Sequence, residues 1–342
     1  MLMKRITYIV LLLAALMSSC SRGGADVQDP KPSVYYWRTV FSLDSTEQQF
    51  LAQHHVGRIY MRYFDVALLR GNVMPNATIS FDQPVPQDIE IIPTVFIVEN
   101  CLNADLNGVA QKLVNRILKM NKVHNINNVK EIQIDCDWTK NSQERYFNFL
   151  NEVRQLLTPL GMRLSATIRL HQLIMKAPPV DYGVLMMYNT GAIDATNGHN
   201  PILDYRDVYP YLKNLRNYSL PLCAAWPAYK WNLLKTGNQF KAILYDVNLA
   251  DTSLYREVAP GHIVVVANRS LPEPNSDGSD LTRVLLGDSV ITVMPTDSQI
   301  LDIISATEKE RPGINKQAII YSLDTKNINN YNTQFYEKVF NR

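Results

Sequence analysis

The sequence predicts an α/β protein built as a closed (β/α)8 barrel, or TIM barrel, with a β-rich insertion after the seventh strand. Short runs rich in apolar, β-branched and aromatic residues alternate with stretches of helical period, which is typical of a parallel sheet with crossover helices. No Gly-rich phosphate loop follows the first run, so a closed barrel is favoured over an open doubly wound sheet, which stays the alternative. The eight expected strands are residues 34–41, 57–63, 89–98, 131–138, 163–171, 182–189, 220–226 and 317–323.

Helices are expected between the strands because apolar residues recur at spacings of three and four. Residues 109–120 place Val109, Leu113, Ile117 and Met120 on one face, which predicts a helix packed against the sheet. Residues 142–157 and 298–310 repeat this pattern. Between them, residues 235–296 break the rhythm with strand-like runs at 240–247, 262–267 and 289–294 and a turn-rich stretch at 272–278. We expect these to form the insertion within a barrel of residues 32–342.

The N-terminus predicts export. Lys4 and Arg5 precede an apolar run at 6–16, which is far shorter than the roughly 20 residues that a membrane-spanning helix needs. Residues 1–19 therefore indicate a signal peptide. Residues 16–20 (LMSSC) resemble the bacterial lipobox, and this resemblance implies that Cys20 is lipidated and begins the mature protein. Residues 20–31 are predicted to be a tether.

A lipid on Cys20 makes the membrane a partner and the cell envelope, as an outer-membrane lipoprotein, the expected location. The alternative is an ordinary secretory signal and a soluble periplasmic protein. Three further cysteines, Cys101, Cys136 and Cys223, form an odd set, so no disulfide framework is indicated. No Cys and His spacing indicates a metal site, and no cofactor is expected.

Composition excludes two broad classes of protein. The net charge is +2 and 46% of the residues are hydrophobic, so neither nucleic-acid binding nor disorder is indicated. Partners must therefore be inferred from individual sites.

The segment 131–139 (EIQIDCDWT) is the most informative part of the chain. Strand side chains alternate between faces, so Asp135 and Asp137 share a face and Cys136 lies on the other. The apolar set must face the helices, which turns both aspartates into the barrel near the end of the strand where barrel enzymes keep their chemistry. Two like charges roughly 6 to 7 Å apart are costly there. The structural alternative is that they cap loops or pair with arginines.

Other strands also place polar residues on the inward face. These are Arg58, Tyr60 and Arg62 on the second strand, Ser165, Thr167, Arg169 and His171 on the fifth, and Tyr188 on the sixth. A barrel built for stability alone would fill these layers with branched apolar residues. We therefore predict a polar, charge-lined cavity.

Two short motifs carry a resemblance to a known family. Residues 134–138 (IDCDW) resemble the acidic strand of chitinase-type glycoside hydrolases and of related uncharacterised hydrolase-like lipoproteins from bacteria, and residues 186–189 (MMYN) resemble their Met-x-Tyr-Asp stretch. The chain departs from the family at Thr139, where the general-acid glutamate stands, and at Ile132 and Asn189, where aspartates stand. The resemblance implies a TIM barrel acting on a carbohydrate polymer or oligosaccharide.

Glycoside hydrolysis uses two carboxyl groups, one protonated and one ionised. The resemblance implies Asp137 as the main catalytic carboxylate, with Asp135 tuning it. The second carboxylate would come from Glu99, Asp65 or Asp324. Aromatic residues at strand ends that could stack on sugars are Trp37, Trp138, Trp226, Tyr229 and Trp231. The residues predicted to bind substrate are Arg62, Glu99, Trp138, Arg169, Tyr188 and Trp226.

Three functions stay open at this point. The first is a glycosidase. The second is a noncatalytic surface glycan-binding protein on a degenerate hydrolase barrel, which Thr139 favours. The third is a periplasmic scaffold without a sugar ligand. A serine triad is not indicated, because no Gly-x-Ser-x-Gly elbow occurs.

Overall fold

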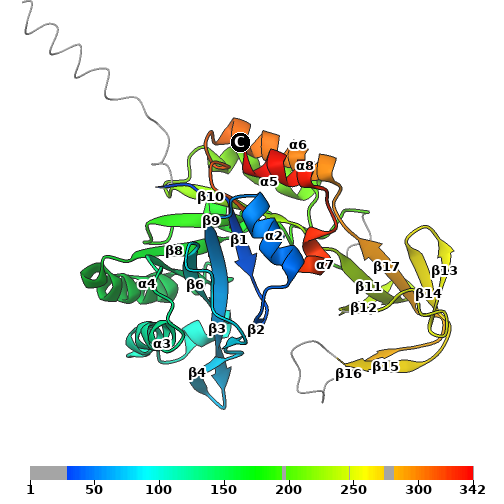
Figure 1. The fold of residues 1–342 in the computed structure, drawn as a ribbon, viewed down its shortest axis with the longest axis horizontal. Helices are drawn as coiled ribbons and strands as arrows, with labels where there is room; N and C mark the ends of the chain where they lie inside the picture. Colours follow the sequence, from blue (N-terminus) through cyan, green and yellow to red (C-terminus); the bar gives the residue numbers. More distant parts are fainter. Residues whose placement is uncertain (1–28, 195–197, 246, 273–280, 342) are drawn as a thin grey trace, which may run out of the picture.

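The computed structural model describes residues 29–194, 198–245, 247–272 and 281–341. Eight parallel strands close into a barrel in the order β1-β18-β10-β9-β8-β7-β6-β3, and β1 pairs with β3 to complete the circle (Figure 1). They are β1 (Ser33–Tyr36), β3 (Arg58–Leu69), β6 (Glu90–Ile97), β7 (Glu131–Asp135), β8 (Arg163–Ile168), β9 (Tyr182–Met186), β10 (Leu222–Pro227) and β18 (Ala318–Tyr321). The predicted strands and closed fold are confirmed, and the open-sheet alternative is wrong.

The side chains of β7 alternate as predicted. The Tyr35 hydroxyl donates to Gln133 Oε1 at 2.7 Å across the barrel, and the Thr167 hydroxyl donates to Asp135 Oδ1 at 2.6 Å. Cys136 is buried and adds to the raised pKa of the buried Tyr146 hydroxyl, which burial raises most. The acidic strand therefore turns its carboxylates into the barrel.

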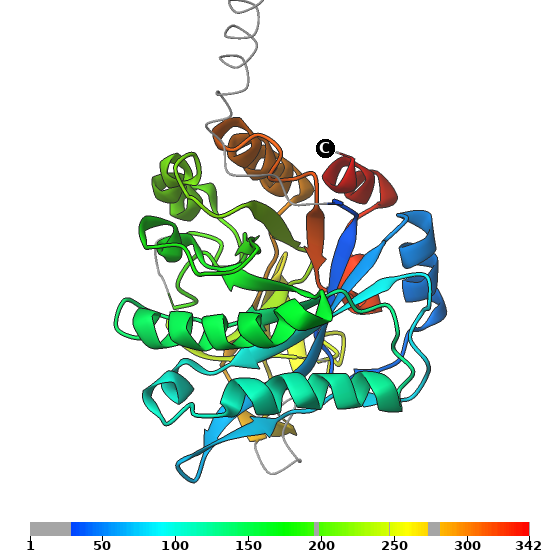
Figure 2. The ribbon, with the colours of Figure 1, turned by 90° about the vertical axis from the view of Figure 1, so that its left-hand side faces the viewer.

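Helices surround the barrel, and α3 (Val109–Val123) and α4 (Gln143–Leu157) lie side by side over one flank (Figure 2). Together with α6 (Asp297–Glu310), they are the predicted helices with slightly shifted ends. The structure also contains helices that were not predicted, namely α2 (Ser45–Gln53), α5 (Tyr205–Leu215), α7 (Thr325–Ile328) and α8 (Thr333–Phe340). Three short 3-10 helices, η1 (Glu99–Asn103), η2 (Thr158–Leu160) and η3 (Leu170–Ile174), complete the set in the described part of the chain.

The insertion after β10 forms its own antiparallel sheet, which projects from the barrel on the side away from α3 and α4 (Figure 1). Its strand order is β12-β11-β17-β14-β13. The strands are β11 (Trp231–Thr236), β12 (Gln239–Leu244), β13 (Tyr255–Ala259), β14 (His262–Val265) and β17 (Ser289–Val293), beside a hairpin of β15 (Arg269–Pro272) and β16 (Leu281–Val284). The sheet starts at Trp231 rather than at residue 235, and most of the turn-rich stretch 272–278 lies outside the described residues.

Two smaller pairings flank the barrel. Strand β3 continues beyond the barrel and forms a hairpin with β4 (Asn72–Asn76). Strands β2 (Val40–Phe41) and β5 (Ser80–Phe81) pair in parallel. These pairings extend the first and second βα units without entering the barrel interior.

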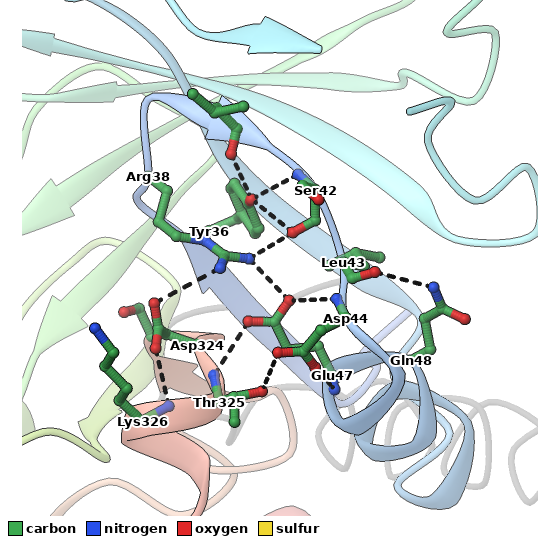
Figure 3. Close-up of polar contacts among 12 residues, drawn as sticks. Tyr36, Arg38, Ser42, Leu43, Asp44, Glu47, Gln48, Asp324, Thr325 and Lys326 are labelled. Atoms are coloured by element: carbon green, nitrogen blue, oxygen red, sulfur yellow. Dashed lines mark hydrogen bonds and ion pairs between the residues drawn. The ribbon is translucent and has the colours of Figure 1, made fainter. Parts of the chain in front are cut away.

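A polar seam joins the first and last βα units (Figure 3). Arg38 donates to the buried Glu47 at 2.8 Å and lies 3.7 Å from Asp324, and the Thr325 amide donates to the other Glu47 oxygen at 3.1 Å. Burial raises the pKa of Glu47, and Arg38 opposes this shift. Glu47 and the Asp44 side chain also form a capping box at the start of α2. The buried Glu47 carboxylate at the start of α2 therefore connects Arg38, which follows β1, with Thr325, which follows β18.

We call the N-terminal ends of the barrel strands the floor and their C-terminal ends the mouth. On the floor, Arg58 pairs with Glu90 at 2.9 Å and with Asp29 at 3.3 Å. The Gly57 amide donates to the Pro32 carbonyl at 2.9 Å. The described chain thus begins against the floor.

The predicted signal peptide 1–19 and Cys20 lie outside the described residues, and the tether 20–31 is described only from Asp29. Within the described ranges, no helix is both long and apolar enough to cross a membrane.

Candidate functional site

At the mouth, one guanidinium holds both aspartates of the acidic strand. Arg169 follows β8 and donates through Nη2 to Asp135 Oδ1 at 3.2 Å and through Nε to Asp137 Oδ1. Asp135 is buried, whereas 55% of the Asp137 side chain is exposed. Burial raises the pKa of Asp135, while Arg169 and the Thr167 hydroxyl oppose the rise. Asp137 is therefore the carboxylate that a ligand can reach.

A third carboxylate, Glu99, stands beside Thr139. It lies at the start of η1, just after β6, which pairs with β7. Its Oε1 atom accepts hydrogen bonds from Ser142 at 2.7 Å and from Thr139 at 2.8 Å. These bonds lower the pKa of Glu99, Ser142 contributing most, and the charge of nearby Asp137 acts in the opposite direction. Thr139, just after β7, thus supplies a hydroxyl that binds a carboxylate located just after the neighbouring strand β6.

Arg62 forms an ion pair with Asp65. Its Nε donates to Asp65 Oδ1 at 2.7 Å and its Nη2 to the other oxygen of the same carboxylate, a bidentate pair. The guanidinium also lies 5.7 Å from the centre of the Trp37 ring. Arg62 therefore forms part of the mouth, with its charge already neutralised.

Aromatic rings cross the mouth from β1 towards the insertion. Tyr188 stacks on Tyr321 with ring centres 4.5 Å apart, and Trp37 lies 5.9 Å from Tyr321 on the other side. Tyr229 contacts Tyr188 at 6.2 Å and Trp231 at 5.7 Å. Rings of this kind can stack on the apolar faces of sugars.

A pocket of about 330 Å³ opens beside Asp137 and Arg169. Its remaining lining is Leu170, His171, Met186, Tyr188, Asn189, Thr190 and Tyr211. The structure therefore brings together Asp137, Arg169 and Tyr188 in one cavity, with Asp135 below it and Glu99 near Asp137.

Two residues predicted to bind substrate need correcting. Trp138 is fully buried, and its ring packs against Tyr146 at 6.0 Å and Phe147 at 5.3 Å on α4. Trp226 is also fully buried and donates to Asn315 at 3.1 Å. Trp138 lies three residues after the end of β7 and Trp226 lies within β10. Both rings are packed inside the protein, so neither is available to stack on a ligand.

Sequence reasoning missed several residues of the mouth. Tyr321 lies two positions after Ile319 and four after Gln317, on the inward face of β18, so the alternation rule applied to this strand could have found it. Ser142 gave no such signal, because its role depends on Glu99 from a distant part of the chain. Tyr211 was missed together with α5.

Within the described residues, no group of three or more His, Cys, Asp and Glu side chains is arranged to hold a metal ion. The side chains described above for the mouth carry carboxylates, guanidiniums, hydroxyls and aromatic rings.

Comparison with solved structures finds the same barrel fold in two chitinases and a spore cortex-lytic enzyme. A chitinase from Chromobacterium violaceum superposes with a TM-score of 0.54 at 13% identity, over 91% of this chain and 98% of that one. The spore cortex-lytic enzyme SleL from Bacillus cereus gives 0.51 at 17% identity, over 91% and 75%. A mutant GH18 chitinase from Cycas revoluta in complex with (GlcNAc)4 gives 0.52 at 11% identity, over 91% and 99%.

No family model matches the chain, and a search of curated proteins finds no match. At such low identities the structural likeness shows the fold. The molecule is built as a TIM barrel with additional β-sheets, a fold that it shares with these solved chitinases.

Proposed function

We propose that this protein binds a carbohydrate polymer or oligosaccharide at the barrel mouth without hydrolysing it. The observation that carries the proposal is Thr139, which stands where the resembling family has its general-acid glutamate and donates a hydrogen bond to Glu99. The mouth has the aromatic rings and polar groups of a sugar-binding site. Its carboxylates Glu99 and Asp137, however, accept hydrogen bonds from protein groups instead of carrying a proton for catalysis.

A glycosidase needs a protonated carboxyl group beside the leaving oxygen. Glu99 is a poor candidate for this role, because the two hydroxyls lower its pKa and favour the ionised form. Asp137 accepts a hydrogen bond from the Arg169 guanidinium, so one of its oxygens is already engaged by the protein. The pKa of Asp135 is raised, but this side chain is buried and held by Thr167 and Arg169.

The lining of the mouth supports a carbohydrate ligand. Exposed Asp137 and the pocket beside it offer hydrogen-bond acceptors, and the rings of Trp37, Tyr321 and Tyr188 offer stacking surfaces. Two of the solved chitinase structures that share the fold hold (GlcNAc)4 and (GlcNAc)3. A sugar chain is the ligand class that fits this combination of rings and polar groups.

The test is a panel of soluble polysaccharides scored for both binding and release of reducing ends. We expect retardation in at least one affinity gel and no release. Asp137→Asn should weaken the retardation, whereas Asp181→Asn, a half-exposed partner of Arg154 far from the mouth, should not. Release of reducing ends that depends on Asp137 would identify a glycosidase, and failure to bind any glycan would favour the scaffold function.

We further propose that the protein is exported and anchored in the outer membrane through a lipid on Cys20. The charged start, the short apolar run and the lipobox-like residues 16–20 support this. The anchor would make the protein a surface or periplasmic glycan receptor.

A further inference from the structure

A second pocket opens between the β3–β4 hairpin and α3, on the outside of the barrel (Figure 1). Its volume is about 260 Å³, which exceeds the roughly 150 Å³ of an engineered apolar cavity that binds benzene. Phe64, Val66 and Val73 line it from the hairpin, and Val109 and Leu113 line it from α3. The pocket is therefore large enough for a small apolar ligand.

The apolar surface continues from this pocket onto the hairpin. Leu68 pairs with Val73 across the hairpin and is 36% exposed, and Met74, which lines the pocket, is 47% exposed. Contiguous exposed apolar surface marks a binding site, whereas scattered exposed apolar residues are ordinary. A ligand longer than the pocket would keep apolar contacts on the hairpin.

Two cations also line the pocket. Lys112 and Arg116 are four residues apart on α3, so they lie on the same face of the helix. The Arg116 guanidinium donates to the Thr78 hydroxyl at 2.9 Å and lies 5.1 Å from the centre of the Phe64 ring, and its buried Nε atom has no acceptor. Within the described residues neither cation forms an ion pair.

The carboxylates around the pocket leave these two charges uncompensated. Helix α3 carries further cations at Lys119 and Lys122 and has no acidic residue. Asp65, which lies between two pocket residues of β3, is paired with Arg62 at the mouth. The remaining carboxylates on the adjacent loops and on α4 do not line the pocket and form no ion pair in the described part of the chain, namely Asp82, Asp88, Asp105, Glu144 and Glu152.

We propose that this pocket binds a free medium-chain alkyl carboxylate such as decanoate, with the alkyl chain between the hairpin and α3 and the carboxylate on Lys112 and Arg116. A carboxylate only accepts hydrogen bonds, and lysine and arginine only donate them. Hydrogen bonds between such charged groups are about twice as strong as neutral ones. The pocket shares no lining residue with the pocket at the mouth, so the inference does not depend on glycan binding.

The test is calorimetric titration of the purified protein with decanoate, octanoate, decanol and decylammonium, each below its micelle concentration. We expect one decanoate per chain, bound about tenfold more tightly than decanol, because decanol keeps the alkyl chain and lacks the charge. Octanoate should bind about 15-fold more weakly than decanoate, since it buries two CH₂ groups fewer. Decylammonium should not bind, because its charge has the sign of the two cations.

Charge reversal on α3 locates the site. Lys112→Glu should weaken decanoate binding by about tenfold or more and leave decanol binding unchanged, because it removes a cation from the pocket and keeps the apolar walls. Lys112 is exposed, so the variant should fold. Lys122→Glu is the matched control. It makes the same change about 15 Å further along the helix, beyond the screening length of about 8 Å at physiological salt, and should keep decanoate binding.

Three results would overturn the inference. The first is the absence of decanoate binding, and the second is equal binding of decanoate and decanol. The third is an equal loss of decanoate binding in the Lys112→Glu and Lys122→Glu proteins. Sedimentation with phosphatidylglycerol vesicles in the absence of decanoate binding would point to a membrane surface as the occupant and would also overturn it.

Discussion

Asp135 and Asp137 share Arg169 but differ in their surroundings. Asp135 is enclosed by Thr167 and Arg169, whereas Asp137 reaches solvent. Breaking a buried pair costs far more than breaking an exposed one, because the remaining charge is left unpaired away from water. Substitution of Asp135 should therefore mainly lower stability, whereas substitution of Asp137 should mainly weaken glycan binding.

We expect Asp137→Asn to weaken glycan binding while the melting temperature changes by only a few degrees. Asp135→Asn should instead lower the free energy of unfolding by about 3 kcal/mol, because it removes a charge from a buried ion pair. Thermal melts of both variants beside the binding assay check this. An Asp137→Asn protein with full binding would show that the ligand does not contact the acidic strand.

The hydroxyl of Ser142 sets the ionisation of Glu99. Its hydrogen bond is the largest cause of the lowered pKa, so Ser142→Ala should raise the pKa of Glu99 towards its ordinary value. Carbon-13 NMR titration of the carboxyl group measures this directly. Ser253→Ala, which removes a hydroxyl from Asp251 in the insertion, is the matched control and should leave Glu99 unchanged.

The same shift has a consequence for stability. A carboxylate whose pKa is lowered by folding stabilises the protein above its unfolded pKa of about 4.3. This contribution is lost as the pH falls through the lower, folded value. In the Ser142→Ala protein this contribution should be smaller, so the variant should be less stable than the unsubstituted protein near neutral pH, and the difference should shrink as the pH falls through the folded pKa of Glu99. A difference in the free energy of unfolding that is the same at neutral and acidic pH would show that the ionisation of Glu99 does not contribute to it.

At the level of elements, β9 is packed so closely that one residue must be glycine. A Cβ atom on Gly183 would lie 2.7 Å from Ile168 and 2.9 Å from Leu222, both buried side chains. Overpacking of this kind destabilises by about 1 to 3 kcal/mol. Gly183 thus lets β9 sit tightly against its neighbours β8 and β10.

Gly183→Ala should lower the free energy of unfolding by about 1 to 3 kcal/mol, as measured by urea titration. Gly57→Ala is the control, because the three atoms nearest to its new Cβ all belong to the side chain of Lys31, which is partly exposed and can move. We expect the control to lose clearly less stability. Equal losses in the two variants would contradict the packing argument.

The sequence predicts the strands of this fold more completely than its helices. The eight strands and the inward face of β7 follow from periodicity, because each strand has one face towards the interior and one towards the helices. Helix α5 was missed because Pro210 and its tyrosines obscure the apolar stripe of Val208, Leu212 and Leu215.

The site itself could be read only in part. Asp135, Asp137 and Arg169 follow from alternation and strand order. The burial of Trp138 and Trp226 depends on contacts outside their own strands, which the strand pattern does not show. The bonds from Thr139 and Ser142 to Glu99 join residues far apart in sequence, and no local pattern encodes such a contact.

For the whole molecule, the first question is whether Cys20 anchors it. Replacing Cys20→Ala should move the exported protein from the membrane fraction to the soluble fraction, because the lipid on Cys20 is the proposed attachment and the apolar run 6–16 of the signal peptide is too short to span a bilayer. Fractionation followed by immunoblotting measures this. A variant that still sediments with membranes after export would show that the lipid is not the anchor.

The contact between Asp29 and Arg58 on the floor has a geometric consequence for such an anchor. Cys20 and Asp29 are nine residues apart in the sequence, a distance that a fully stretched chain covers in about 30 Å. A lipid at Cys20 would therefore hold the floor near the bilayer and turn the opposite end of the barrel away from it. Long glycan strands could then reach the rings and carboxylates without passing between protein and membrane, and neighbouring copies in the same bilayer could grip one strand together. Even if each copy binds the glycan weakly, several copies that bind the same strand would hold it with a higher avidity.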